Sequence, residues 1–188
     1  MARSQTSKKP PKNRLLYAIP LVALIGLASV YILANNPFAG GPVLDYTVQM
    51  NIQESNGTAV RFIFPVDPVG ESGGIWATHV HDSLGVDSSH YPVYMDRPPN
   101  PYPRYSIIHV KSRSNYTFVL GDFFSVWGMT LGRTNTVNIP VRGNFTWQMC
   151  LITSNNQVPS FLWGQEPLHD GMRITLLYYD PNKGLGCA

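Results

Sequence analysis

The longest apolar run in the chain lies near its start and constrains everything that follows. Residues 15–34 (LLYAIPLVALIGLASVYILA) contain no charged side chain, and a helix of this length crosses a hydrocarbon core of about 30 Å. A cleaved signal peptide is the alternative, although its apolar region usually spans only about 7 to 15 residues. We therefore predict an uncleaved transmembrane helix at 15–34.

Charge is distributed unevenly along the chain. Residues 1–14 hold five of the 14 Lys and Arg side chains and no acid, so nine bases remain beside all 11 acids in residues 15–188. By the positive-inside rule, the basic tail lies in the cytoplasm and the residues after the span lie outside the cell. We expect no nucleic-acid partner, because the excess of positive charge belongs to the tail.

A short segment rich in proline and glycine follows the span. Residues 35–43 (NNPFAGGPV) have the composition of a linker. The sequence thus predicts a single-pass protein of the cell membrane with four parts. These are a cytoplasmic tail (1–14), a transmembrane helix (15–34), a linker (35–43) and an extracellular domain (44–188).

The extracellular domain contains short runs rich in β-branched and aromatic residues, separated by residues that favour turns. Helical character is confined to Asp122–Trp127, where Asp122 resembles an N-cap, and Asn56-Gly57 favours a tight hairpin turn. We therefore predict an all-β domain, either an antiparallel sandwich or a barrel-like fold. The predicted strands are Tyr46–Gln53, Ala59–Phe64, Ile75–His81, Tyr105–Lys111, Tyr116–Leu120, Thr136–Val141, Thr146–Ile152 and Met172–Tyr179.

One long segment interrupts the strand pattern. Residues 83–104 (SLGVDSSHYPVYMDRPPNPYPR) contain five prolines. Connections of this length inside compact domains are often functional. We interpret the segment as an ordered loop or lid, with a surface insertion as the alternative.

Two further features agree with an external compartment. The only two cysteines, Cys150 and Cys187, are consistent with one disulfide in an oxidising environment, with two free thiols as the alternative. Three Asn-x-Ser/Thr triplets, at Asn56, Asn115 and Asn144, mark positions where glycans can be added to an external domain.

Three of the five histidines frame the proline-rich segment. In an extended strand, residues i and i+2 project from the same face, so the imidazoles of His79 and His81 would converge. His109 lies in an otherwise apolar run and would complete a site with three nitrogens if its strand faces the first. Structural or pH-responsive histidines are the alternatives.

Three imidazoles with one open position suit zinc or copper. Asp82 is either a fourth ligand or an acceptor that orients an imidazole ring. A blue-copper site is not expected, because neither Cys150 nor Cys187 lies in the loop pattern of such sites. The chain has no nucleophile elbow, phosphate loop or dinucleotide fingerprint. A hydrolase with a metal-bound water stays open as a minor alternative.

Three motifs carry a resemblance to a known family. Residues 76–82 (WATHVHD), 107–112 (IIHVKS) and 117–128 (TFVLGDFFSVWG) resemble the HTHD, GIIHVES and FTLGDFFxIWG-like motifs of an uncharacterised archaeal and bacterial family of secreted or membrane-anchored proteins. The resemblance covers about residues 46–180. It implies a compartment and a fold more than an activity.

Matched by position, His79, His81 and Asp82 fall on the HTHD element, and His109 falls on the histidine of the second motif. Typical members join these two motifs through a few residues and often carry histidines in the first strand. This chain has the proline-rich segment between the motifs and Tyr46-Thr47-Val48-Gln49-Met50 in the first strand.

Two functions follow as hypotheses. The first is a membrane-anchored extracellular β domain that binds copper or zinc through His79, His81 and His109. The second is an accessory subunit of a larger membrane complex, in which the histidines have a structural role and other subunits are the partners. For the second, Gly26, Ala28 and Ser29 give the apolar run a modest surface for helix packing.

Overall fold

The computed structural model describes residues 42–98, 104–153, 156–183 and 186–187 of the chain. These residues belong to one compact unit, Gly41–Ala188. The predicted tail (1–14), the predicted transmembrane helix (15–34) and most of the predicted linker lie outside the described residues. Within the described part, no helix is both long and apolar enough to cross a membrane.

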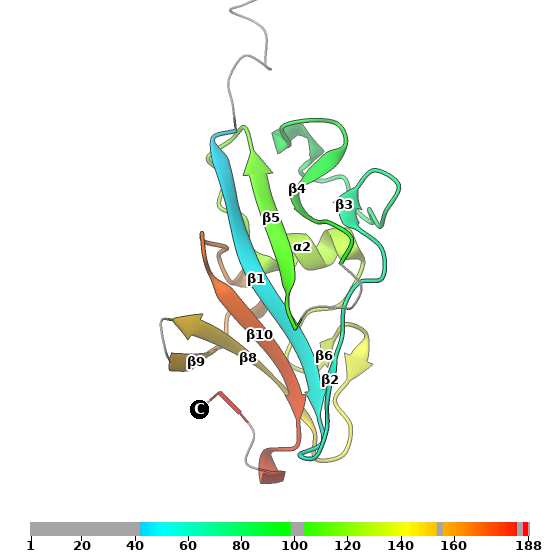
Figure 1. The fold of residues 1–188 in the computed structure, drawn as a ribbon, viewed down its shortest axis with the longest axis vertical. Coiled ribbons are helices and arrows are strands. Elements are labelled where there is room, and N and C mark those ends of the chain that lie inside the picture. The colour runs from blue at the N-terminus through cyan, green and yellow to red at the C-terminus, as the bar shows by residue number, and fades with distance from the viewer. Residues whose placement is uncertain (1–41, 99–103, 154–155, 184–185, 188) are drawn as a thin grey trace, which may run out of the picture. The chain divides into compact units, whose positions relative to one another are not determined.

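The unit is built on one sheet of eight strands (Figure 1). Seven of them follow the order β3-β4-β5-β1-β10-β8-β9, and β2 also pairs with β1; β6 and β7 form a separate hairpin. The strands are β1 (Leu44–Ser55), β2 (Val60–Phe62), β3 (Val69–Glu71), β4 (His90–Met95), β5 (Ser106–Ser112), β6 (Asn135–Thr136), β7 (Ile139–Pro140), β8 (Thr146–Thr153), β9 (Asn156–Ser160) and β10 (Arg173–Tyr179).

The sheet is mixed. β1 pairs with β5 and β2 in antiparallel orientation along one edge, but it pairs with β10 in parallel along the other, with Gln49 opposite Arg173. The prediction of a β-rich domain is confirmed. The parallel pair is a difference from the antiparallel expectation, because alternating hydrophobicity marks the faces of a strand but not the direction of its neighbour.

The core lies on one face of the sheet. Val48, Met50 and Ile52 alternate along β1 and are at most 1% exposed, whereas Thr47 and Gln49 lie on the opposite face. The helix α2 (Leu120–Trp127) covers the apolar face and lies behind β1 and β5 in Figure 1. The core also includes four fully or almost fully buried aromatic residues, Tyr91, Phe118, Phe123 and Phe124.

The short predicted helix is present and begins two residues earlier than expected. Its N-cap is Val119, and Asp122 lies in the third helical position, where its carboxylate accepts a hydrogen bond from the Val119 amide at 2.9 Å. Gly128 ends the helix in the left-handed conformation, with φ of 72°, which a glycine adopts without strain.

Gly121, in the first turn of α2, packs against the 3₁₀ turn η2 (Trp163–Gln165) through backbone alone. A Cβ at position 121 would lie 2.6 Å from the Gly164 carbonyl oxygen, whereas a Cβ at position 164 would lie 3.7 Å from Gly121 Cα. Although alanine usually stabilises a helix interior, we expect Gly121→Ala to lower the free energy of unfolding by about 1–3 kcal/mol. Gly164→Ala is the matched control, and equal losses in urea unfolding would contradict this packing.

The proline-rich segment contains regular structure that the sequence did not indicate. It includes the 3₁₀ turn η1 (Asp82–Leu84) and the strand β4, which pairs with both β3 and β5. Tyr91 and Val93 of β4 are at most 1% exposed. The segment is therefore partly core and is not simply a lid or a surface insertion.

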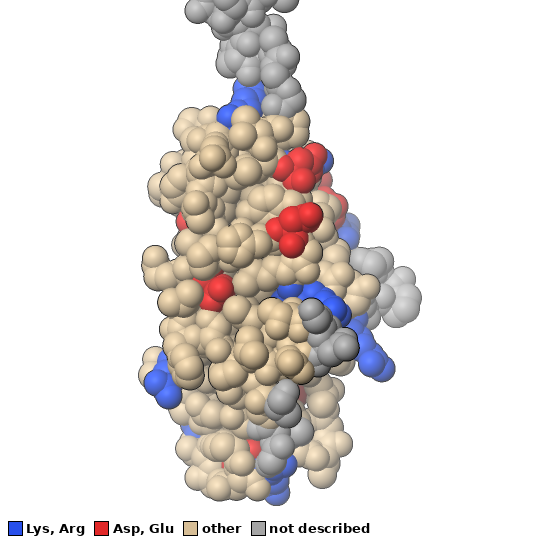
Figure 2. Space-filling model, turned by 90° about the vertical axis from the view of Figure 1, so that its left-hand side faces the viewer, with Lys and Arg blue, Asp and Glu red and all other residues tan. Residues whose placement is uncertain are grey.

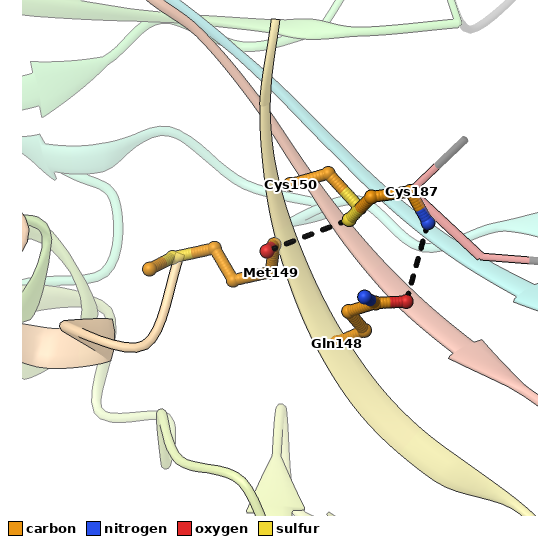
Figure 3. Close-up of a disulfide and its surroundings, with 4 residues drawn as sticks. All are labelled: Gln148, Met149, Cys150 and Cys187. Atoms are coloured by element: carbon orange, nitrogen blue, oxygen red, sulfur yellow. Dashed lines mark hydrogen bonds between the residues drawn. A yellow bond between two sulfur atoms is a disulfide. The ribbon is translucent and has the colours of Figure 1, made fainter. Parts of the chain in front are cut away.

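The C-terminal segment is fastened to the sheet by a disulfide between Cys150 and Cys187 (Figure 3). Cys150 lies in β8 and is fully buried. The Cys187 amide also donates a hydrogen bond to the Gln148 side chain at 3.2 Å. Of the two predicted alternatives, a disulfide and two free thiols, the structure contains the disulfide.

Candidate functional site

The segment that carries His79 and His81 is not a strand. Ile75 makes a single bridge to Val69, and the chain then turns. The Leu84 amide donates to the His81 carbonyl at 2.9 Å as η1 begins. The rule that residues i and i+2 share a face applies only to extended backbone, so the predicted convergence of the two imidazoles does not hold.

His109 and His81 lie on opposite faces of the sheet. In β5, Ile108 and Val110 are fully buried in the core, so His109 between them projects from the other face, where its ring stacks on Tyr94 at 5.0 Å. His81 instead contacts Tyr91 and Phe118, which belong to the core.

Each of four histidines has its own aspartate. The closest nitrogen–oxygen distances are 2.7 Å for His79–Asp82, 3.6 Å for His81–Asp122, 3.0 Å for His90–Asp87 and 3.2 Å for His109–Asp96. Among the described residues, no group of three or more His, Cys, Asp or Glu side chains is placed to hold a metal ion. The hypothesis that the domain binds copper or zinc through a cluster of His79, His81 and His109 is therefore wrong. Asp82 does contact an imidazole ring, that of His79, which is one of the two roles predicted for it.

Asp82 and Asp87 face a groove of about 300 Å³ whose lining includes Trp76 and His90. Both carboxylates already have local partners. Asp82 binds the His79 ring and accepts from the Trp76 indole N–H at 3.3 Å. Asp87 accepts from the backbone amides of Ser89 and His90 and contacts the His90 ring. These contacts order the loops around η1 and β4, which is a structural role.

Tyr94 lies between two of these histidines and is 6% exposed. Burial, with the nearby carboxylates of Asp96 and Asp45, raises the pKa of Tyr94 to about 12. Because an unfolded tyrosine ionises near pH 10, the stability from this group is complete below about pH 10 and is lost as pH rises towards about 12.

Tyr94→Phe therefore changes the dependence of stability on pH. Between about pH 10 and 12, we expect the free energy of unfolding to fall with pH more steeply for the wild type than for Tyr94→Phe. The two slopes should differ by up to about 1.4 kcal/mol per pH unit. Urea unfolding across this range, with Tyr105→Phe as an exposed control, measures the two slopes. Equal slopes would show that the phenol is not protected by the fold.

A second region of interest lies at the end of β9, the edge strand of the sheet. Phe161 and Leu162 follow β9 and are 72% and 54% exposed, and Val158 on β9 is 41% exposed. We call these three residues the β9 patch. Figure 2 shows the side of the domain where β9 forms the edge, and most of this surface is uncharged.

The backbone next to the β9 patch is held in place. Trp163 begins η2 with φ of 49°, a left-handed conformation that is costly for a bulky residue. The Gly121–Gly164 contact fixes η2 against α2. Beneath the turn, the Ser160 hydroxyl donates to the buried Glu166 carboxylate. The exposed side chains of Phe161 and Leu162 are therefore carried by a well-supported turn.

A pocket of about 130 Å³ adjoins the patch at the point where β9 leaves β8. β9 pairs with Met149–Thr153 only, so Thr146–Gln148 have no strand on that side among the described residues. The lining residues are Arg133, Thr146, Trp147, Gln148, Met149, Ser160, Phe161, Trp163 and Tyr179.

The fold and these surfaces define a disulfide-linked, β-rich domain with an exposed apolar patch beside a small aromatic pocket. No protein-family model, curated protein or solved structure matches this chain. The sequence did contain a signal for the patch, since Phe161-Leu162-Trp163 is a run of large apolar residues between Pro159 and Gly164.

Proposed function

We propose that this chain is an accessory subunit of a membrane complex: a β domain held outside the cell by an N-terminal span, with the β9 patch as its contact to another subunit. The observation that carries the proposal is the exposure of Phe161 and Leu162 side by side on a supported turn. Contiguous exposed apolar side chains are typical of interfaces.

An external location is supported by two observations on the domain. The Cys150–Cys187 disulfide is a kind of bond that persists in oxidising compartments. The three asparagines of the possible glycosylation triplets, Asn56, Asn115 and Asn144, are all exposed. Together with the apolar run at 15–34 and the basic tail before it, these features favour the external side of a membrane.

A contact through side chains is favoured over the addition of another strand to β9. Edge strands invite pairing with strands of other chains, and proteins often prevent this with proline. Pro159 removes one backbone donor from β9. A partner is then recognised by the apolar side chains of the β9 patch rather than by a continued ladder of backbone hydrogen bonds.

The proposal is tested on the full chain in its native membrane. After mild solubilisation, we expect the wild type to migrate in a complex larger than the monomer, and the double variant Phe161→Ala/Leu162→Ala to shift towards the monomer. Val66→Ala is the matched control, because Val66 is an apolar residue that is 70% exposed elsewhere. A wild-type chain that migrates only as a monomer would overturn the proposal, as would a complex that the double variant leaves intact.

A further inference from the structure

The pocket beside the β9 patch is the size of a single ring. Its volume is about 130 Å³, close to that of a cavity of about 150 Å³ that accepts benzene in another protein. Four aromatic residues from three segments belong to its lining: Trp147 in β8, Phe161 and Trp163 after β9, and Tyr179 in β10. This shape and lining suit one planar side chain.

The register of β8 and β9 shows which backbone groups of β8 point towards this pocket. In an antiparallel pair, residues that exchange two backbone hydrogen bonds alternate with residues that exchange none. Cys150 lies opposite Pro159, which has no N–H, so the neighbouring pairs Met149–Ser160 and Leu151–Val158 are the bonded ones. The backbone groups of Met149 and Leu151 therefore point towards β9.

Trp147 is two residues before Met149, so its backbone N–H and C=O point to the same side of β8. At Trp147 this side lies beyond the end of β9 and is not paired with it. Trp147 is only 2% exposed. Among the described residues, its N–H has no hydrogen-bond partner outside the sheet ladder, and its C=O has only a long contact of 3.5 Å from the Thr146 hydroxyl. A polar atom on a ligand in the pocket would replace water as the hydrogen-bond partner of these backbone groups.

The mouth of the pocket carries a positive charge. Arg133 belongs to the lining, and its residue is exposed. No Asp or Glu in the described part of the chain forms a salt bridge with Arg133. An acidic residue on a partner would complement this guanidinium, and Phe161 at the rim would exclude water from the contact.

We propose that the partner subunit inserts a tyrosine side chain into this pocket, next to an acidic residue that meets Arg133. The phenol ring fills the aromatic lining, and its hydroxyl reaches the backbone groups of Trp147. The inference rests on the proposed function, since it names the side chain by which the partner would be recognised. Buried aromatic anchors of this kind often supply much of the binding energy of an interface.

The test uses the full chain in lipid nanodiscs and the peptide acetyl-Asp-Tyr-Asp-amide as the probe. Saturation-transfer NMR at about 5 mM peptide detects a site with a dissociation constant near 1 mM. We expect saturation transfer from the protein to the protons of the tyrosine ring. Replacing tyrosine by phenylalanine in the peptide should weaken binding about 2- to 10-fold, the effect of one neutral hydrogen bond, and replacing it by alanine should abolish the signal.

Protein variants locate the binding. We expect Phe161→Ala and Arg133→Gln each to weaken binding of the tyrosine peptide at least several-fold, and Val66→Ala to leave it unchanged. Absence of transfer to the tyrosine peptide would overturn the inference, as would equal binding of the alanine peptide or of Phe161→Ala. Preferential binding of methyl β-D-glucopyranoside would also overturn it, because the pocket would then be a sugar site.

The two proposals fail in different ways. If the complex depends on Phe161 and Leu162 but the pocket does not bind the peptide, the accessory-subunit proposal stands and the tyrosine anchor is rejected. A wild-type chain that is only monomeric in its membrane would reject the accessory-subunit proposal whatever the peptide does.

Discussion

Loss of the Cys150–Cys187 disulfide is expected to lower the free energy of unfolding by about 4 kcal/mol. The two cysteines are 37 residues apart, and in the chain-entropy description a crosslink of this span restricts the unfolded chain by about that amount. Cys150→Ala/Cys187→Ala is the variant of choice, because a serine at the fully buried position 150 would add an unpaired hydroxyl.

Urea unfolding of the oxidised wild type, the reduced wild type and the double alanine variant measures this effect. Reduction alone should give most of the loss, since it keeps both side chains and removes only the bond. If the reduced and oxidised proteins unfold at the same urea concentration, the disulfide does not contribute to the stability of the domain.

Phe123→Ala is expected to lower the free energy of unfolding by about 3–5 kcal/mol. Phe123 lies on the buried face of α2, is fully buried and packs edge-to-face with Phe124 at 5.8 Å. Its removal would leave a cavity under the only α-helix in the described part of the chain, and the sheet has no other helix there to fill it.

Ser125→Ala is the matched control for this helix, because Ser125 is exposed on the opposite side of α2. The control should change stability by less than about 0.5 kcal/mol. A small loss for Phe123→Ala, comparable to that of the control, would mean that α2 is not part of the cooperative core.

Local sequence patterns were enough to predict the long strands. The predicted strands Tyr46–Gln53, Thr146–Ile152 and Met172–Tyr179 correspond to β1, β8 and β10 within one to two residues at each end. The Asn56-Gly57 turn also joins β1 to β2 as expected, with Gly57 at φ of 89°. Alternation and turn chemistry are local, so a single sequence carries them.

Elements that depend on distant partners were not predictable in this way. β4 lies in a segment with five prolines, and it is a strand because β3 and β5 flank it. Val119 makes only a bridge to Pro167 before α2 begins, where a strand over Tyr116–Leu120 was predicted. Tertiary contacts override local propensity in both places.

The candidate site was the least predictable part. The histidine hypothesis assumed extended backbone at His79 and His81, and a turn in that segment removed the convergence. The apolar run at 161–163 marks the segment of the β9 patch, but the exposure of its side chains depends on where β9 ends and on how η2 packs against α2, which the run itself does not specify. The sequence did indicate which disulfide could form, because two cysteines allow only one pairing, and Cys150 and Cys187 are bonded in the structure.

The position of β1 determines the order in which the domain can be completed. β1 is synthesised early, but its neighbour on one edge is β10. That edge of β1 therefore stays unpaired until Arg173–Tyr179 have been synthesised. Pairings between such distant segments form slowly and leave intermediates prone to aggregation. Folding of the sheet therefore cannot be completed until the C-terminal part of the domain, with β10, is available to pair with β1.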